Sequence, residues 1–343
     1  MEYFEHGGNN KVDFDYSVNL NPLGIKQSIS SNIQNVLLNR FLLSSYPSVD
    51  NRESIKIIAD YHNIGENNVV IGSGVSELIM RCVSTLPLKK ALLIAPTFSE
   101  YERCLSVNNI EFDYHNLDEE NDFNLDESIL PKLDKNIDAL FLTNPSNPVG
   151  NLVSRELIEK IIDRCNTNSI YLIIDEAFLP FTNEKSSIEL IDKSKYLIVL
   201  RSLTKMYCIA GIRVGYLVLS NDEIKKALDN AAPTWALSAL AISVLPECFN
   251  DGEYESRTRA LIKKERAVLE KALKSYHLKT YGGVAPFILF KADDDNLVKK
   301  LLNYSIAIRD CSNYNNLSKG FYRIAVKDST TNSILISVLR TIL

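Results

Sequence analysis

The chain has few cysteines and histidines, and neither residue type occurs at a spacing that binds metal or builds a disulfide framework. Its six cysteines stand at positions 82, 104, 165, 208, 248 and 311, and no pair is separated by two residues. The four histidines show no metal-ligand spacing either. The sequence therefore predicts no metal site, and it predicts reduced thiols, which are typical of a reducing compartment.

Long apolar runs and an excess of basic residues are also missing. No run reaches the roughly 18 apolar residues that a membrane helix needs, and the N-terminal residues are too polar for a secretory signal. Lys and Arg total 38 against 43 Asp and Glu, a net charge of −5, which lacks the basic footprint of nucleic-acid binding. We expect a cytoplasmic protein that binds neither nucleic acid nor membrane.

What the chain does have is enough apolar sequence for a large core. Of its 343 residues, 45% are hydrophobic and 24% are charged, which is typical of a globular protein. Strands and helices alternate from Val69 to about Leu219, which predicts an α/β fold with a mostly parallel sheet. Short strands at 286–291, 305–309 and 321–326 then predict a smaller α+β domain.

The length and these patterns divide the chain into segments. The N-terminal residues are expected to form an extended arm with a turn at Asn21-Pro22. A long helix that begins near Glu253 leads into the second domain. Shorter helices are expected at 28–38 and 237–249. The segments are an N-terminal arm (1–25), a segment that joins the small domain or an interface (26–50), a large domain (51–250) and a small C-terminal domain (251–343).

The most informative motif is Ser202-Leu203-Thr204-Lys205, followed by Arg213. A lysine can form a Schiff base with the aldehyde of pyridoxal phosphate. A serine hydroxyl and an arginine fork can hold the phosphate of the same cofactor. The alternative is a basic turn between two strands, and the motif alone does not decide between the two interpretations.

Two further signals follow apolar strands. Asp175 closes the run 170–174, which is typical of a buried parallel strand. A carboxylate at that edge of a sheet can pair with a protonated pyridine nitrogen. Asn147 lies in a rigid Pro- and Gly-containing loop after the strand 139–142, where it could bond a ring hydroxyl. Taken alone, Asp175 has a helix cap or a surface turn as the less favoured alternative, whereas for Asn147 an ordinary strand-to-helix turn is the better interpretation.

A glycine pair follows the first strand of this region. Gly72 and Gly74 precede a helix, so backbone N–H groups there can approach a phosphate. Glu77 stands where a dinucleotide fingerprint has its third glycine, which argues against a dinucleotide. Phe98 follows another strand and could stack on a flat cofactor, although most such aromatic residues belong to the core.

Together these signals resemble the fold-type I pyridoxal-phosphate enzymes of the aspartate aminotransferase superfamily, over essentially the whole chain. Within it, the resemblance is strongest to the threonine-phosphate decarboxylase family, which is related to the histidinol-phosphate aminotransferases. The His6-Gly7-Gly8-Asn9 opening discriminates best, because the aminotransferases generally lack it. The other segments that carry the resemblance are Tyr16 to Gly24, Ser45 to Pro47, Leu200 to Lys205, Ile308 to Tyr314 and Phe321 to Val326.

The resemblance implies a role for each candidate residue. Lys205 is the Schiff-base lysine and the main proton carrier. Asp175 pairs with the pyridine nitrogen of the cofactor, Asn147 bonds its ring hydroxyl, and Phe98 stacks on its ring. The cofactor phosphate is held by Ser202, Arg213 and the backbone of Gly74 and Val75. Tyr46 reaches that phosphate from the partner subunit of a homodimer with shared active sites. The substrate set is Arg323 for the carboxylate, and Arg309 with His6 and Asn21 for the phosphate.

The sequence departs from the family pattern at three places. Phe178 stands where many aminotransferases have a tyrosine that bonds the ring oxygen, and this favours the decarboxylase branch. Lys327 stands where a second arginine is expected, and a lysine lacks the bidentate fork. Thr234 separates Pro233 from Trp235, which the family tends to have adjacent. The last two departures bear on the identity of the substrate.

The implied reaction is the pyridoxal-phosphate-dependent decarboxylation of L-threonine O-3-phosphate to (R)-1-amino-2-propanol O-2-phosphate in cobalamin biosynthesis. L-Serine O-phosphate, one methyl smaller, is a second candidate substrate, because a methyl discriminates by only about 1–3 kcal/mol. The alternative is a histidinol-phosphate-type aminotransferase that uses 2-oxoglutarate. A third hypothesis, a cofactor-binding protein that has lost catalysis, fits poorly with the presence of Lys205, Asp175 and Arg323 together.

Overall fold

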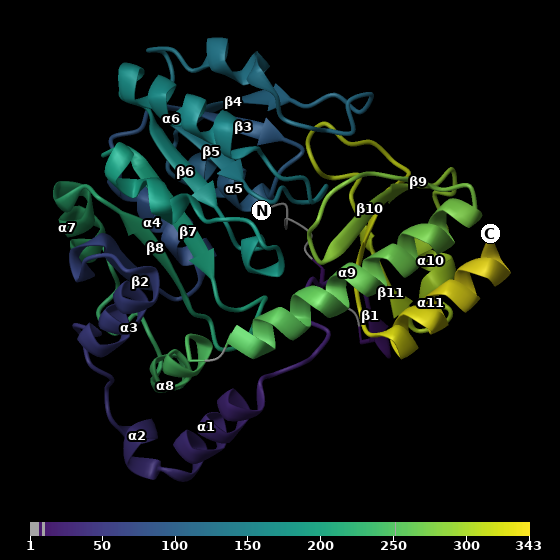
Figure 1. Cartoon of the computed structure of the whole chain (residues 1–343), viewed down its shortest axis with the longest axis horizontal. Helices are drawn as coiled ribbons and strands as arrows, with labels where there is room; N and C mark the ends of the chain where they lie inside the picture. Colours follow the sequence, from purple (N-terminus) through teal and green to yellow (C-terminus); the bar gives the residue numbers. More distant parts are fainter. Residues whose placement is uncertain (1–6, 9–10, 251) are drawn as a thin grey trace.

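A computed structural model describes residues 7–8, 11–250 and 252–343. A seven-stranded sheet formed between residues 69 and 219 lies at the centre of the larger part of this described chain (Figure 1). The strand order is β2-β8-β7-β6-β5-β3-β4, and β8 runs antiparallel to both neighbours while the other pairs are parallel. The predicted α/β class with a mostly parallel sheet is therefore confirmed. The strands are β2 (Val69–Gly72), β3 (Lys90–Ala95), β4 (Glu111–Asn116), β5 (Ala139–Thr143), β6 (Tyr171–Asp175), β7 (Leu197–Ser202) and β8 (Gly215–Leu219).

The central strands are apolar on both faces, because helices cover the sheet on both sides. Every residue of β5 is buried, and β6 is buried beyond Tyr171. In the edge strand β4, exposed residues alternate with partly buried ones. This strand could not be predicted from the sequence, because it contains no continuous run of apolar residues. The helices of this larger part are α3 (Arg52–His62), α4 (Val75–Thr85), α5 (Ser99–Val107), α6 (Arg155–Asn168) and α7 (Asp222–Asn230), with 3-10 turns at Glu66–Asn68, Glu127–Lys132, Leu179–Phe181, Ser187–Lys193 and Pro246–Cys248.

The second sheet lies beyond the long helix α9 (Gly252–Ser275), which crosses the molecule toward the C-terminal half (Figure 1). Its antiparallel strands have the order β12-β13-β10-β9. Their bounds are β9 (Lys279–Thr280), β10 (Phe287–Lys291), β12 (Arg309–Asp310) and β13 (Phe321–Ala325), with α10 (Leu297–Leu302) and α11 (Ser329–Ile342) beside them. The strand expected at 305–309 divides into β11 (Ile306–Ala307) and β12, and β11 pairs instead with β1 (Phe14–Asp15) of the N-terminal arm.

Residues 26–50 form a separate helical projection. Helix α1 (Gln27–Leu38) packs against α8 (Ala239–Val244), and α2 (Arg40–Ser44) extends beyond it with no buried residue. The helix expected at 237–249 is shorter in the structure, because a 3-10 turn starting at Pro246 follows α8. None of the helices in the described part of the chain is long and apolar enough to span a membrane.

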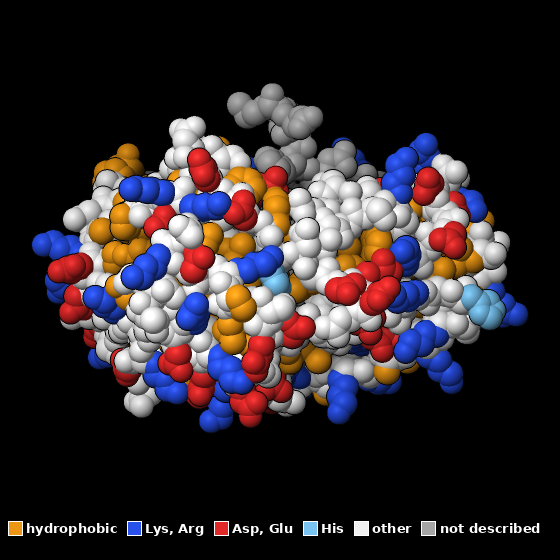
Figure 2. Space-filling model, turned by 90° about the horizontal axis from the view of Figure 1, so that it is seen from above, with side chains coloured by type: hydrophobic (Ala, Val, Ile, Leu, Met, Phe, Trp, Pro, Cys, Tyr) orange, Lys and Arg blue, Asp and Glu red, His pale blue; other side chains and the backbone are white. Residues whose placement is uncertain are grey.

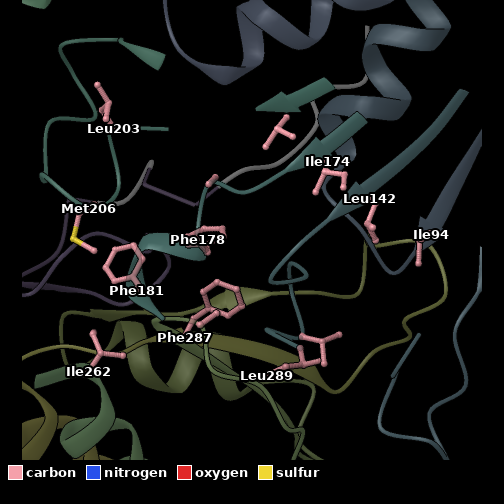
Figure 3. Packing of buried hydrophobic residues seen from close by; sticks show 14 of the residues in the cluster. Ile94, Leu142, Ile174, Phe178, Phe181, Leu203, Met206, Ile262, Phe287 and Leu289 are labelled. Carbon is pink, nitrogen blue, oxygen red and sulfur yellow. The ribbon is translucent and has the colours of Figure 1, made fainter. Parts of the chain in front are cut away.

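The two sheets share one apolar core. Ile94, Leu142 and Ile174 lie at the carboxyl ends of β3, β5 and β6, and the side chains of the second sheet approach them from the other side (Figure 3). Phe178 and Phe287 meet edge to face, with ring centroids 5.0 Å apart. This continuous core fixes the second sheet over the edge where β5, β6 and β7 end. On the face seen in Figure 2, acidic and basic side chains are interspersed.

Candidate active site

A cavity of about 260 Å³ lies at that shared edge, between the carboxyl ends of the parallel strands and the second sheet. The lining residues come from the N-terminal arm, from the segments that follow β2, β3, β5, β6 and β7, and from β12, β13 and the loop between them. Those that the argument uses are Asn19, Val75, Phe98, Asn147, Asp175, Phe178, Ser202, Thr204, Lys205, Arg213, Arg309, Tyr314 and Arg323. This is the place where ligands bind in open α/β sheets.

Lys205 and Asp175 give the cavity its acid–base chemistry. Burial, and after it the positive charges of Arg323 and Arg213, lower the pKa of the Lys205 amine to about 8, while the charge of Asp175 acts in the opposite direction. An amine with this pKa is partly uncharged near neutral pH and can act as a nucleophile or carry a proton. Burial raises the pKa of Asp175, whose Oδ1 accepts a hydrogen bond from the Ala177 N–H at 2.9 Å.

The start of α4 forms an anion cradle. Gly74 has φ +89°, and a Cβ on it would lie 2.8 Å from Nη2 of Arg213. The backbone there thus approaches the guanidinium more closely than a side chain would allow. The helix begins at Val75, so its first N–H groups face the cavity without intrahelical acceptors. Ser202 Oγ lies 2.8 Å from Thr204 Oγ1 beside this cradle. Amides, hydroxyls and a guanidinium together suit the phosphate of pyridoxal phosphate.

Two arginines form the opposite wall. Arg323 on β13 and Arg309 on β12 stand directly opposite each other in the antiparallel pair, and only 6% and 7% of their surfaces are exposed. Arg323 donates to Asn147 Oδ1, to Tyr314 Oη at 3.3 Å and to the Ser17 carbonyl at 3.2 Å, while its buried Nε has no partner among the described residues. Arg309 donates to Asn313 Oδ1 at 2.7 Å.

The two buried guanidinium groups make this wall suitable for binding anions. Like charges directly opposite on neighbouring strands repel each other, and a buried unpaired N–H costs about 1–3 kcal/mol. An anionic ligand that binds the two guanidinium groups would relieve both penalties. The cavity therefore combines a nucleophilic amine, a buried carboxylate, an anion cradle at α4 and a second anion site on β12 and β13.

Most of the residues proposed from the sequence come together here. Lys205, Val75, Phe98, Asn147, Asp175, Ser202, Arg213, Arg309 and Arg323 line the cavity, and Gly74 adjoins it. Tyr46 does not line this cavity: it is 77% exposed and stacks on Trp235 with ring centroids 4.1 Å apart. Lys327 is also outside the lining, and His6 lies outside the described residues.

Asn21 has a different place from the one expected. Its Nδ2 donates to the Met206 carbonyl and to Thr258 Oγ1, each at 2.7 Å, and its Oδ1 accepts from the Leu23 N–H at 2.9 Å. These bonds occupy the amide and tie the loop after Lys205 to α9. In the structure, Asn21 therefore supports the lysine loop rather than lining the cavity where a substrate phosphate would bind.

The sequence reasoning missed several cavity residues. Asn19, two residues before Asn21, lines the cavity, and in the part of the chain that the structure describes its buried Oδ1 has no partner. Tyr314 joins the two arginines, because its hydroxyl bonds Arg323 and its ring lies 5.4 Å from the Arg309 guanidinium. Thr204 could have been found from its position beside Lys205. Nothing in the sequence distinguishes Asn19 from Asn21.

Comparisons with known proteins agree with this arrangement. The model of the family "aminotransferase class I and II" matches residues 15–339. A threonine-phosphate decarboxylase from Salmonella typhimurium is 33% identical, over 96% of this chain and 91% of that protein. An adenosylcobalamin biosynthesis bifunctional protein, CobDQ, from Leptospira interrogans is 30% identical over 100% of this chain and 41% of its own length.

A solved structure extends the agreement to three dimensions. The histidinol-phosphate aminotransferase from Clostridium acetobutylicum superposes with a TM-score of 0.89 and 30% identity, covering 96% of this chain and 98% of that one. The predicted fold-type I architecture is thereby confirmed. The match of the family model over nearly the whole chain, together with these relatives, shows that the chain belongs to the class I and II aminotransferase family.

Proposed function

We propose that this chain decarboxylates L-threonine O-3-phosphate to (R)-1-amino-2-propanol O-2-phosphate, with pyridoxal 5′-phosphate as cofactor, in cobalamin biosynthesis. The observation that carries the proposal is the pair Arg309 and Arg323, both buried and directly opposite each other in the cavity that contains Lys205. Such a pair suits a substrate with two anionic groups, and threonine phosphate has a carboxylate and a phosphate. The similarity to the Salmonella and Leptospira proteins supports the reaction and the pathway.

The residues that hold the cofactor follow from the cradle geometry. Its phosphate would lie at the start of α4, between Val75, Ser202 and Arg213, and its ring between Phe98 and the strand ends. Asp175 would accept a hydrogen bond from the pyridine nitrogen, and Lys205 would bond the aldehyde. When bound, pyridoxal phosphate supplies an electron-accepting ring that stabilises the electron pair left when a bond to Cα breaks.

The chain's own side chains orient and protonate the substrate. Arg323, whose Nε has no partner among the described residues, binds the carboxylate, and Arg309 binds the phosphate. Gripping both ends fixes the bond from Cα to the carboxylate relative to the ring, and the phosphate supplies binding energy for this distortion. After CO₂ leaves, Lys205 Nζ returns a proton to Cα, a task suited to an amine whose pKa burial lowers to about 8.

A homodimer with shared active sites is part of the proposal. Residues 25–49 present apolar side chains to solvent on α1, α2 and the following loop, among them Leu38 at 81%, Phe41 at 74% and Tyr46 at 77% exposure. Contiguous exposed apolar surface of this kind marks an interaction site. A second copy would cover this surface, and the family resemblance implies that Tyr46 then reaches the partner's cofactor phosphate. We also propose that the enzyme acts in the cytoplasm, where its six unpaired cysteines stay reduced.

The second candidate is a histidinol-phosphate aminotransferase, which the superposition on the Clostridium acetobutylicum enzyme favours. Phe178 argues for the decarboxylase, because it packs on Phe287 and has no hydroxyl to offer the ring oxygen. A substrate panel separates the candidates. The enzyme is incubated with threonine phosphate, serine phosphate or histidinol phosphate, with and without 2-oxoglutarate. We expect CO₂ and aminopropanol phosphate without any oxo acid. Glutamate formed from histidinol phosphate, with no CO₂ from either phosphoamino acid, would assign the chain to the second candidate.

A further inference from the structure

Behind the cavity wall, Tyr101 contacts the far side of Asp175. Tyr101 belongs to α5 and is 0% exposed, and it does not line the cavity. Its hydroxyl lies 2.8 Å from Asp175 Oδ2 and 2.8 Å from Thr143 Oγ1. Its ring is held between Phe141, at 5.3 Å between centroids, and Phe98, at 5.8 Å. The hydroxyl therefore has one fixed position and cannot rotate away from the carboxylate without disturbing the core.

The direction of these hydrogen bonds follows from the chemistry of a carboxylate. An ionised Asp175 can only accept, so the Tyr101 hydroxyl donates to Oδ2, and the Thr143 hydroxyl in turn donates to Tyr101. Burial, and secondarily the Asp175 charge, raise the pKa of Tyr101 well above its ordinary value, so it remains a donor throughout the working pH range. The Ala177 N–H satisfies Oδ1 at 2.9 Å. Both carboxylate oxygens thus have a donor and a defined orientation.

The charge on Asp175 depends on this donor. Burial is the largest effect and raises the pKa of Asp175, and the neighbouring Glu176 acts in the same direction. The hydrogen bond from Tyr101 is the strongest effect that opposes burial, ahead of the Ala177 N–H and the charge of Lys205. An anion that partners a pyridine nitrogen must stay ionised and aimed at one point, and within the described residues Tyr101 is the hydroxyl donor to Oδ2.

We propose that Tyr101 is a positioning residue for the cofactor: its hydroxyl, backed by Thr143, holds the Asp175 carboxylate in the orientation and charge state that keep the pyridine nitrogen protonated. This inference rests on the proposed function, because it takes Asp175 as the partner of that nitrogen. The expected consequence is tighter cofactor binding and a ring nitrogen that keeps its proton to higher pH.

Tyr101→Phe tests the proposal, because it removes the hydroxyl and keeps the ring. The readouts are the dissociation constant of pyridoxal phosphate and nitrogen NMR of the ring-labelled cofactor in the holoenzyme across pH. Loss of a hydrogen bond to a charged group should weaken cofactor binding about tenfold, and the nitrogen should lose its proton about 1 pH unit lower. Tyr281→Phe is the matched control, because Tyr281 is also buried and donates to a carboxylate, Glu119 Oε1, at 2.5 Å.

Asp175→Asn separates this inference from the proposed function. A shift in Tyr101→Phe with none in Tyr281→Phe supports the role of Tyr101. If Asp175→Asn changes the nitrogen titration and Tyr101→Phe does not, the positioning role is wrong and the assignment of Asp175 stands. If Asp175→Asn changes neither cofactor binding nor the nitrogen titration, the assignment of Asp175 is wrong, and the inference about Tyr101 is then wrong as well. Equal shifts in both tyrosine variants also overturn the inference. If Tyr101→Phe does not fold, Thr143→Val is the deciding variant. A smaller shift of the nitrogen titration in the same direction supports the role of Tyr101, and an unchanged titration refutes it.

Discussion

At the scale of single residues, Lys205 shows how burial and neighbouring charge make a side chain reactive. Burial together with the positive charges of Arg323 and Arg213 lowers the pKa of its amine from an ordinary 10.5 to about 8. Because only the uncharged amine bonds an aldehyde, covalent uptake of pyridoxal phosphate by the apoprotein should rise with pH around a midpoint near 8. Borohydride trapping followed by peptide mapping measures this uptake.

Two variants control that measurement. Lys205→Ala should remove the labelled peptide, and Arg323→Gln should move the midpoint to higher pH, because it removes a positive charge that disfavours the protonated amine. Labelling of a different lysine, or a midpoint near that of an ordinary lysine, would contradict the assignment.

Arg323 carries a second prediction at this scale. Lysine keeps the charge but loses the fork and the unpartnered Nε. Arg323→Lys should therefore lower kcat/KM by about tenfold to a hundredfold while the cofactor stays bound, since charged hydrogen bonds contribute about 1.5–3 kcal/mol. Steady-state kinetics and the absorbance of the bound cofactor separate the two effects. Arg340→Lys, on the exposed side of α11, is the control and should change neither. Unaltered substrate kinetics in Arg323→Lys would rule out the carboxylate role.

At the scale of elements, the strands were easier to predict than what lies between them. Buried strands such as β5 and β6 are continuous apolar runs, so their carboxyl ends, and with them Asp175 and Asn147, could be placed from the sequence. The edge strand β4 has no such run. Tyr101 could not be found, because it belongs to an amphipathic helix 74 positions before Asp175 and nothing local distinguishes its hydroxyl from a core tyrosine.

The pair Asn19 and Asn21 gives a prediction at the scale of the loop. Asn21→Ala removes three hydrogen bonds, one to the loop after Lys205, one to α9 and one within the N-terminal arm, so it should lower the free energy of unfolding by about 2 kcal/mol. Asn19→Ala removes an Oδ1 that has no partner among the described residues, so it should leave stability nearly unchanged and weaken substrate binding, because this oxygen can accept a hydrogen bond from a donor on the substrate. Denaturant unfolding and substrate titration check both variants. The reverse pattern would restore Asn21 as the phosphate residue.

At the scale of the whole molecule, the site exists only because two sheets meet. Arg323 donates to Asn147, which lies 176 positions earlier in the chain. The apolar core that includes Phe178 and Phe287 holds the two sheets in a fixed position relative to each other. The sequence motifs identified most of the individual side chains, but they could not predict that the two sheets bring these side chains together. The family resemblance supplied that expectation. The division into segments and the homodimer remain predictions.

Shared sites can be tested by complementation. If Tyr46 completes the partner's site, Tyr46→Ala and Lys205→Ala chains should each be nearly inactive alone, yet a mixture should regain activity, because one of the two sites in a mixed dimer has both residues. Activity after subunit exchange, followed with differently tagged chains, is the measurement. No recovery despite proven exchange, from a Tyr46 variant that is itself inactive, would exclude shared sites.

The central claim is that the bond from Cα to the carboxylate breaks, and solvent labelling measures this most directly. The holoenzyme is incubated in D₂O with threonine phosphate labelled in its carboxyl carbon and without any 2-oxo acid. The account predicts one labelled CO₂ for each aminopropanol phosphate, and one deuterium on the former Cα, delivered by Lys205. Retained carboxyl label with deuterium exchanged into the Cα of recovered threonine phosphate would show that the Cα–H bond breaks instead, and would contradict the account.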